Sequence, residues 1–406
     1  MSVILNINEY LPPIWTPPQN IYGARVYKTN ATTTKCIRLA DAVDMEAAAQ
    51  KGTTAGHSDF DLIKPYINMK MYNVIGQDIT AVEGDENFKY DGTNGDVVVR
   101  HDKYYYKVEN TDEYIDFYLS ETKHEGFNCI PCNYDFVNNK EIDTIFISRY
   151  AVDNTYASRS GVRPIATARS TARPLIKGKG SNYFMYDYMV NFSLWLLYLV
   201  EFADTNSETT IGRGLDTANP ATGGTDLLAY HTGELGGAAG TTEMCYRNIE
   251  RMVSYYGVHV DGLTFFTNSS SILRPQYCLD RTKYADRTTA AIPTGYIDTG
   301  FNLGLYAGNG VPVFYKNMIS DPNVDFLMLP SGVGGNANGY FASALTNYYA
   351  ATTANLYGYV MRVGGVGSTP APPTPSRNRI FSVSYNGLAD HGGYIRFYWV
   401  PDGKVV

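Results

Sequence analysis

The chain carries little charge for its size. Only 18% of its 406 residues are Asp, Glu, Lys or Arg, below the roughly 25% of typical soluble domains. No run of Lys and Arg occurs, and the formal net charge is −7. These features exclude sequence-independent binding of nucleic acid by neutralisation of its phosphates, so no nucleic-acid partner is expected.

Long apolar runs are also missing. The most apolar window, 184–202, contains Asp187, Asn191 and Glu201, and its uninterrupted part is shorter than the ~20 residues that a bilayer core requires. We therefore expect a buried helix there and no membrane insertion. The first fifteen residues have no basic cluster and soon reach prolines, which is not the pattern of a secretory signal.

Cysteine is scarce, and its count is odd: Cys36, Cys129, Cys132, Cys245 and Cys278. Such a sparse set does not form a disulfide framework, and it fits assembly in a reducing cytoplasm. Cys129 and Cys132 have the Cys-x-x-Cys spacing of metal and redox sites, but no second ligand pair accompanies them. Two plain thiols are the favoured interpretation, with a disulfide or a metal as the alternative.

Catalytic signatures are absent. The sequence has no G-x-S-x-G, no complete phosphate loop, no G-x-G-x-x-G and no H-E-x-x-H. Its six histidines are scattered singly: His57, His101, His124, His231, His259 and His391. We therefore expect no catalytic residues, no metal ligands and no cofactor. Carboxylates are plentiful, so a pair flanking a cleft, as in glycoside hydrolases, stays open.

Tyrosine and glycine are abundant where charged residues are few: the chain has 35 tyrosines and 38 glycines. Tyrosine offers a large contact area with few rotatable bonds. A weakly charged, tyrosine-rich chain is typical of proteins with extensive contact surfaces, so a homo-oligomer is expected. The run Tyr104–Tyr106 must place at least one ring on an outer face, because side chains alternate along a strand.

The sequence divides into three segments. Residues 1–20 hold four prolines around Trp15 and are expected to be a docking arm, with a poorly ordered terminus as the alternative. Residues 21–145 show strand patterns and Asp-Gly and Asn-Gly turns, which predict a β-rich module. Residues 146–406 predict an α+β domain, with helices over 167–176 and 183–202, long loops, and closing strands over 379–385 and 394–400.

An ordered set of short motifs adds a resemblance. The set comprises Ile21-Tyr-Gly-Ala-Arg, Asp91-Gly-Thr-Asn-Gly-Asp, Ile147-Ser-Arg-Tyr, Ser160-Gly-Val-Arg-Pro, the Trp195-centred helix, Tyr246-Arg-Asn-Ile-Glu, Val260-Asp-Gly and Ile395-Arg-Phe. In this order it resembles a family of bacteriophage and prophage tail proteins. Their C-terminal half is a C-type-lectin-like domain, similar to formylglycine-generating enzymes and to the variable proteins of diversity-generating retroelements.

The resemblance implies an α+β fold in which the β-rich module precedes a C-type-lectin-like domain with long loops. Two family activities are not implied. The enzyme members use paired cysteines late in the chain, and no cysteine follows Cys278. The calcium-dependent lectins use Glu-Pro-Asn or Gln-Pro-Asp with Trp-Asn-Asp, and none of these triplets occurs.

The same resemblance places a ligand face on the last two strands and their link. The expected binding residues are Tyr385, Asn386, Asp390, His391, Tyr394, Arg396 and Tyr398. Aromatic rings stack on sugars, and amide or guanidinium groups fix hydroxyls. The alternative is that the tyrosines only cover a sheet edge.

These observations predict a non-enzymatic phage virion protein of the tail or baseplate, assembled in the host cytoplasm. Its N-terminal region would bind other virion proteins, and its C-terminal domain a glycan or protein of the host surface. One alternative is a purely structural fibre, collar or head-decoration protein whose loops bind neighbouring subunits. The other is a hydrolase of envelope glycans.

Overall fold

The computed structural model describes most of the first 303 residues and parts of the remainder. The described ranges are 20–28, 36–215, 220–237, 240–253, 257–267, 273–303, 313–321, 323–333, 344–345, 357–363, 383–386 and 393–402. Residues 1–19 of the predicted docking arm, and the predicted site residues Asp390 and His391, lie outside these ranges.

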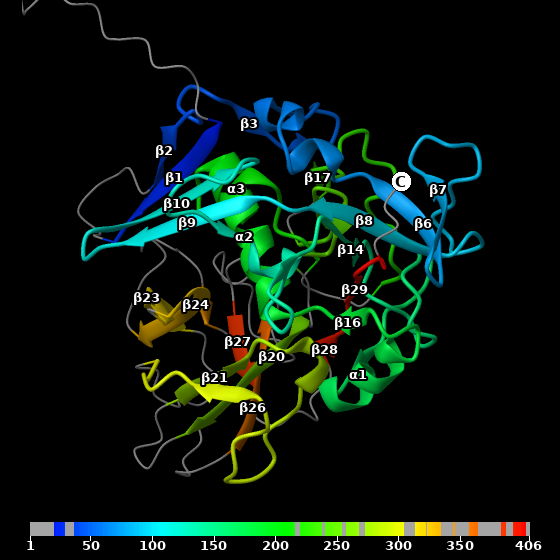
Figure 1. Ribbon diagram of the computed structural model, residues 1–406. Coiled ribbons are helices and arrows are strands. Elements are labelled where there is room, and N and C mark those ends of the chain that lie inside the picture. Colours follow the sequence, from blue (N-terminus) through cyan, green and yellow to red (C-terminus); the bar gives the residue numbers. More distant parts are fainter. Residues whose placement is uncertain are drawn as a thin grey trace, which may run out of the picture.

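Strands dominate the described chain (Figure 1). Its α-helices are α1 (Arg169–Lys177), α2 (Tyr188–Phe202) and the single-turn α3 (Ser207–Thr210). Short 3-10 helices are η2 (Asp59–Leu62), η3 (Tyr66–Asn68), η4 (Pro131–Asn133) and η5 (Arg281–Lys283).

The predicted α+β class, with a C-type-lectin-like second half, is therefore wrong, and the fold is β-rich. The reason lies in the second half of the sequence. Between its glycine-rich turns this half consists of short β-branched and aromatic runs, such as 258–267 and 324–333, and such runs pair as strands.

Two sheets involve the first part of the chain. A five-stranded antiparallel sheet has the order β11 (Asn128–Cys129), β9 (Tyr105–Asn110), β10 (Tyr114–Ser120), β1 (Ile21–Tyr27) and β2 (Cys36–Ala40). A six-stranded sheet has the order β16 (Tyr183–Met185), β29 (Phe397–Trp399), β14 (Thr144–Ser148), β8 (Asp96–Asp102), β6 (Met71–Ile75) and β7 (Asp78–Val82).

A third, ten-stranded sheet belongs to the second half. Its main path is β15 (Ala166–Thr167), β28 (Gly393–Tyr394), β20 (Val258–Thr267), β26 (Tyr357–Val363), β27 (Val383–Asn386), β25 (Ala344–Leu345), β23 (Val313–Asp321) and β24 (Val324–Val333). Two strands branch from it: β21 (Leu273–Cys278) and β22 (Tyr296–Asp298).

Smaller sheets tie distant segments together. One joins β19 (Ile249–Glu250), β18 (Met244–Tyr246), β17 (Gly233–Glu234) and β4 (Gln50–Lys51). The others are the pairs β12 (Tyr134–Asp135) with β13 (Lys140–Glu141), and β3 (Ala47–Ala48) with β5 (His57–Ser58).

The six-stranded sheet combines strands from residues 71–148 with a strand near the C-terminal end of the described chain. β29, from residues 397–399, lies between β16 and β14, and β14 pairs with β8 through Phe146 and Arg100. The boundary expected between residues 145 and 146 falls inside β14. The two halves therefore share one sheet here, and β4 with β17 joins them a second time.

Helix α2 lies at the centre of the molecule, among the three large sheets (Figure 1). Fourteen of its fifteen residues are buried, so it packs on all sides rather than along one apolar stripe. It begins at Tyr188 and not at Tyr183, because Tyr183–Met185 pair with β29 as strand β16. Its N-cap, Asp187, accepts hydrogen bonds from the amides of Met189 and Val190.

The three consecutive tyrosines, Tyr104–Tyr106, point to alternate sides, as expected along a strand. Tyr104 and Tyr106 are buried, and Tyr105 is partly exposed on the outer side of the five-stranded sheet. Tyr105 donates a hydrogen bond to Glu141 (2.9 Å). The expected outward-facing ring is confirmed.

Candidate functional site

Three of the predicted ligand-binding residues are buried in the structure. Tyr394, Arg396 and Tyr398 are at most 1% exposed. Arg396 donates to the carbonyls of Ser148 (3.0 Å) and Arg149 (2.8 Å), and Tyr398 donates to Asp187 (2.6 Å). The prediction is wrong for these three residues.

The reason is that β29 is an inner strand buried on both faces. Phe397 and Trp399 lie in one apolar cluster, whereas Tyr398 lies in the main core. Alternate residues of a strand form an exposed face only when one face of its sheet is open to solvent. Tyr385 and Asn386 belong to β27, opposite Met361 and Val360, but their side chains lie outside the described part.

Many of the buried charges act as internal braces. Arg169 donates to the carbonyls of Val260 (2.8 Å) and Leu263 (2.7 Å) and to Asp286. Arg173 pairs with Asp261 (2.8 Å) and Asp286 (3.1 Å). Burial alone would raise the pKa of Asp286, but the two guanidinium groups hold it well below its usual range. This network fixes α1 to β20 and to the loop after η5.

A second brace joins the two halves of the chain. Arg247 pairs with the buried Glu201 of α2 and with Asp61 of η2. His231 lies 3.0 Å from Asp61. Burial opposes ionisation of Asp61, but His231 and Arg247 keep its pKa well below the usual value. The charged groups of Arg247, Glu201 and Asp61 are thus engaged in ion pairs within the fold, and these pairs hold the loops around them in place.

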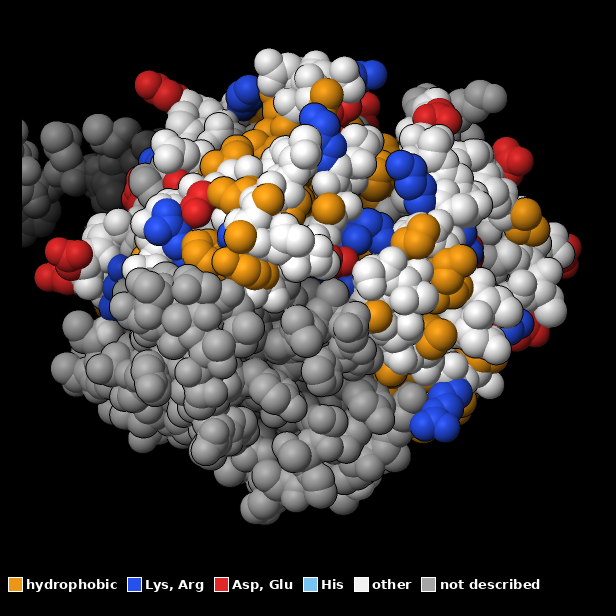
Figure 2. Space-filling model, turned by 90° about the horizontal axis from the view of Figure 1, so that it is seen from below, with side chains coloured by type: hydrophobic (Ala, Val, Ile, Leu, Met, Phe, Trp, Pro, Cys, Tyr) orange, Lys and Arg blue, Asp and Glu red, His pale blue; other side chains and the backbone are white. Residues whose placement is uncertain are grey.

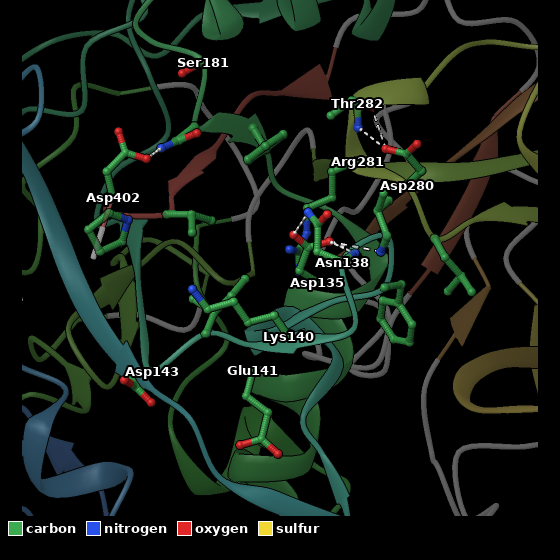
Figure 3. A pocket seen from close by; sticks show the side chains of 18 of the residues that line it. Asp135, Asn138, Lys140, Glu141, Asp143, Ser181, Asp280, Arg281, Thr282 and Asp402 are labelled. Carbon is green, nitrogen blue, oxygen red and sulfur yellow. Dashed lines mark hydrogen bonds between the residues drawn. The ribbon is translucent and has the colours of Figure 1, made fainter. Parts of the chain in front are cut away.

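A groove of about 810 Å³ lies between segments that are distant in sequence. Its walls come from the β12–β13 hairpin and the start of β14, from 181–184, from 279–282 and from 400–402. Apolar side chains line part of it: Phe136, Val137, Ile142, Phe184, Leu279, Val400 and Pro401. Figure 3 shows the polar residues around it, with Asp402 and Asp280 on opposite sides.

The groove is rich in carboxylates. Five acidic and two basic residues line it: Asp135, Glu141, Asp143, Asp280 and Asp402, with Lys140 and Arg281. For Asp135, Glu141 and Asp280, burial raises the pKa by less than the hydrogen bonds lower it, so each pKa lies below its usual value. These three groups are therefore ionised acceptors at neutral pH.

Arg281 does not offer its charge to a ligand. Its Nη2 donates to the carbonyls of Pro131 (3.1 Å) and Cys132 (2.8 Å), and its side chain is 9% exposed. Its guanidinium also lies over the ring of Tyr398, 5.6 Å from the centroid. The charged lining is thus mainly acidic, with Lys140 as its exposed cation, and apolar side chains make up much of the rest.

The groove was not foreseen from the sequence. Its residues come from four short segments, and no local spacing connects them. The turn-forming Asp135-Phe-Val-Asn-Asn139 was the one local signal, since Asp135 accepts the amides of Val137 (3.0 Å) and Asn138 (3.1 Å).

Burial disfavours the thiolate form of the cysteine pair. Cys129 and Cys132 are not joined by a disulfide in the structure. Burial raises the pKa of Cys129 to about 12 and raises that of Cys132 as well. Both are therefore protonated at neutral pH, and a thiolate is the form that binds metals and attacks disulfides.

The described residues hold no metal cluster, and the face in Figure 2 carries no basic stripe. Among them, no three His, Cys, Asp or Glu side chains are arranged to hold a metal ion. On the face in Figure 2, Lys and Arg side chains lie singly among apolar and uncharged atoms. None of the helices in the described ranges is both long and apolar enough to cross a membrane.

No family model and no curated protein matches the chain.

Proposed function

We propose that this protein is a non-enzymatic virion component, of a phage tail or baseplate, that binds a host-surface glycan in the groove between 135–144 and 279–282. The observation that carries the proposal is the groove itself, whose lining combines apolar side chains with carboxylates, three of which are ionised. The motif resemblance to phage tail proteins supports the biological setting. The proposed ligand site is not on the last strand, because Tyr394, Arg396 and Tyr398 are buried in the core.

A neutral, hydroxyl-rich ligand fits this chemistry. Sugar hydroxyls are donors that carboxylates accept, and the apolar edges of a sugar pack on rings such as Phe136 and Phe184. An anionic polymer fits poorly, because the lining carries more acidic than basic groups and Arg281 is occupied. Arg281 ties the 279–282 wall of the groove to the carbonyls of Pro131 and Cys132, just before the β12–β13 hairpin. A wall held in this way lowers the cost of binding in a preformed site.

Hydrolysis of an envelope glycan is the second candidate, because several carboxyl groups face one groove. A glycoside hydrolase needs one of them protonated at working pH, with a raised pKa, to act as the general acid. Asp135, Glu141 and Asp280 have lowered pKa values, so these three are unsuited to that role. Binding without cleavage is the better-supported function.

The test blocks the groove without removing a structural contact. Ser181 lines the groove and is exposed, so Ser181→Trp places a large ring in the ligand's path. Ser170→Trp makes the same change on the exposed side of α1, outside the groove lining. The full-length proteins are titrated onto a panel of immobilised neutral bacterial cell-wall polysaccharides.

The expected result is saturable binding to a member of the panel that Ser181→Trp weakens by at least about tenfold, or about 1.4 kcal/mol. Ser170→Trp should bind like the unchanged protein. Equal binding by all three proteins would move the site elsewhere. Release of new reducing ends during incubation would establish the hydrolase instead.

A further inference from the structure

The five-stranded sheet has a core side and an outer side. Its core-side residues on β1 and β10 belong to the main apolar cluster: Ala24, Val26, Ile115, Phe117 and Leu119. Because side chains alternate along a strand, their neighbours point outward. They form a surface that we call the tyrosine face: Arg25, Tyr27, Tyr114, Asp116 and Tyr118.

The members of the tyrosine face form one connected unit. Asp116 accepts hydrogen bonds from Arg25 Nε (2.7 Å) and Nη2 (2.8 Å), and from the hydroxyl of Tyr118 (3.2 Å). The Arg25 guanidinium lies 3.6 Å from the ring centroid of Tyr114 and 6.0 Å from that of Tyr27. These contacts hold the rings in place before any ligand arrives.

Gly23 lets one of these rings lie flat on the sheet. A methyl group added at Gly23 would lie 2.7 Å from Cδ1 and 3.0 Å from Cε1 of Tyr118. The Tyr118 ring therefore covers the backbone of β1 directly, and its other side faces outward. A flat, fixed aromatic ring beside further tyrosines is the surface that proline-rich peptides recognise.

We propose that the tyrosine face binds residues 12–18 of the same chain, Pro-Pro-Ile-Trp-Thr-Pro-Pro. Proline rings pack on aromatic rings, and the four prolines favour an extended chain without internal hydrogen bonds. The carbonyl groups of such a chain need donors, which the hydroxyls of Tyr27 and Tyr114 supply, since that of Tyr118 donates to Asp116. Trp15 adds the largest apolar surface of the segment.

Chain length and attachment favour this occupant over an external one. The segment ends two residues before Asn20, whose left-handed backbone (φ 55°) interrupts the extended course of the chain just ahead of β1. Residues 12–20 span about 28 Å when extended, and β1 from Ile21 to Tyr27 spans about 20 Å. Folded back along β1, the segment reaches the whole tyrosine face.

Tethering also makes a weak contact sufficient. A short linker gives an effective concentration in the millimolar range, so even a peptide of millimolar affinity occupies the face for much of the time. This inference does not depend on the glycan-binding groove, which lies on other elements.

Tryptophan fluorescence tests the docking in the full-length protein. Of the three tryptophans, Trp195 and Trp399 are at most 4% exposed, so quenching by acrylamide reports mainly on Trp15. We expect restricted quenching in the unchanged protein and increased quenching in Tyr114→Ala/Tyr118→Ala. Tyr134→Ala, which removes a partly exposed tyrosine from the β12–β13 hairpin, should leave quenching unchanged.

An arm-side variant covers the case in which the tyrosine variant misfolds. Pro17→Gly/Pro18→Gly leaves the described body untouched and should also increase quenching, because glycine restores the freedom that proline removes. Quenching of Trp15 in the unchanged protein as complete as in the denatured chain would overturn the proposal. Protection of Trp15 from acrylamide could also disappear on dilution as an oligomer dissociates. That result would show that the tyrosine face binds the arm of another copy, and it would overturn the intramolecular contact.

Discussion

At the scale of single residues, buried charge defines this molecule. The sequence is poor in charged residues, and many of those it has lie inside, in pairs such as Arg169–Asp286 and Arg247–Glu201. A buried pair contributes little net stability, but removing one partner leaves the other uncompensated. The consequences are measurable.

Asp286→Asn should lower the free energy of unfolding by about 3–5 kcal/mol, because the buried Arg169 would lose its nearest carboxylate and keep only that of Asp261, 3.7 Å away. Asp112→Asn, at an exposed position, should change it by less than about 0.5 kcal/mol. Urea titrations of both variants and the unchanged protein measure the difference. Equal stabilities would show that the network around Asp286 is not a brace.

The same residue predicts part of the acid sensitivity. An unfolded aspartate has a pKa of about 3.9, and Arg169 and Arg173 hold the pKa of folded Asp286 far below that despite burial. Its stabilising contribution is therefore complete above about pH 5 and is lost as the pH falls toward the folded pKa. Urea titrations between pH 3 and pH 6 should show a shallower loss of stability in Asp286→Asn than in the unchanged protein. Parallel curves would contradict this.

At the scale of elements, one glycine controls how β20 meets α2. Gly262 has φ 77°, and an added methyl group would lie 2.8 Å from the rings of Tyr188 and Tyr284. Gly300 has the same φ but open space around it. Gly262→Ala should therefore destabilise the protein by about 1–3 kcal/mol more than Gly300→Ala, through overpacking. Thermal unfolding of both variants decides this, and equal losses would mean that the rings move aside.

Individual elements could be predicted where local pattern decides them. Residue spacing predicts helices over 167–176 and 183–202. The structure has both, as α1 and α2, but α2 begins at Tyr188, five residues after the predicted start. Tyr183–Met185 became a strand because β29 pairs with them from far along the sequence. The same long-range pairing buried Tyr398 and Arg396. Residue patterns do not encode such partners, so neither the burial of the last strand nor the groove could be predicted. The β-rich class was open to prediction, because strand-forming runs such as 258–267 and 324–333 are visible in the sequence.

At the scale of the whole molecule, the shared six-stranded sheet predicts a single folding unit. A fragment of residues 146–406 would lose β8, β6 and β7, cut β14, and remove β1, β10 and η4 from around α2. It should lack dispersed amide signals in an NMR spectrum, whereas the full chain should unfold in one calorimetric transition. A folded fragment would show that the two halves are independent domains.

The central claim is that the groove between 135–144 and 279–282 binds a neutral envelope glycan. Hydrogen–deuterium exchange of the full-length protein, with and without the polysaccharide that binds best, tests it most directly. The account predicts slower exchange in 135–144, 181–184 and 279–282, and unchanged exchange in α1. Protection confined to other segments, or none at saturating polysaccharide, would contradict it.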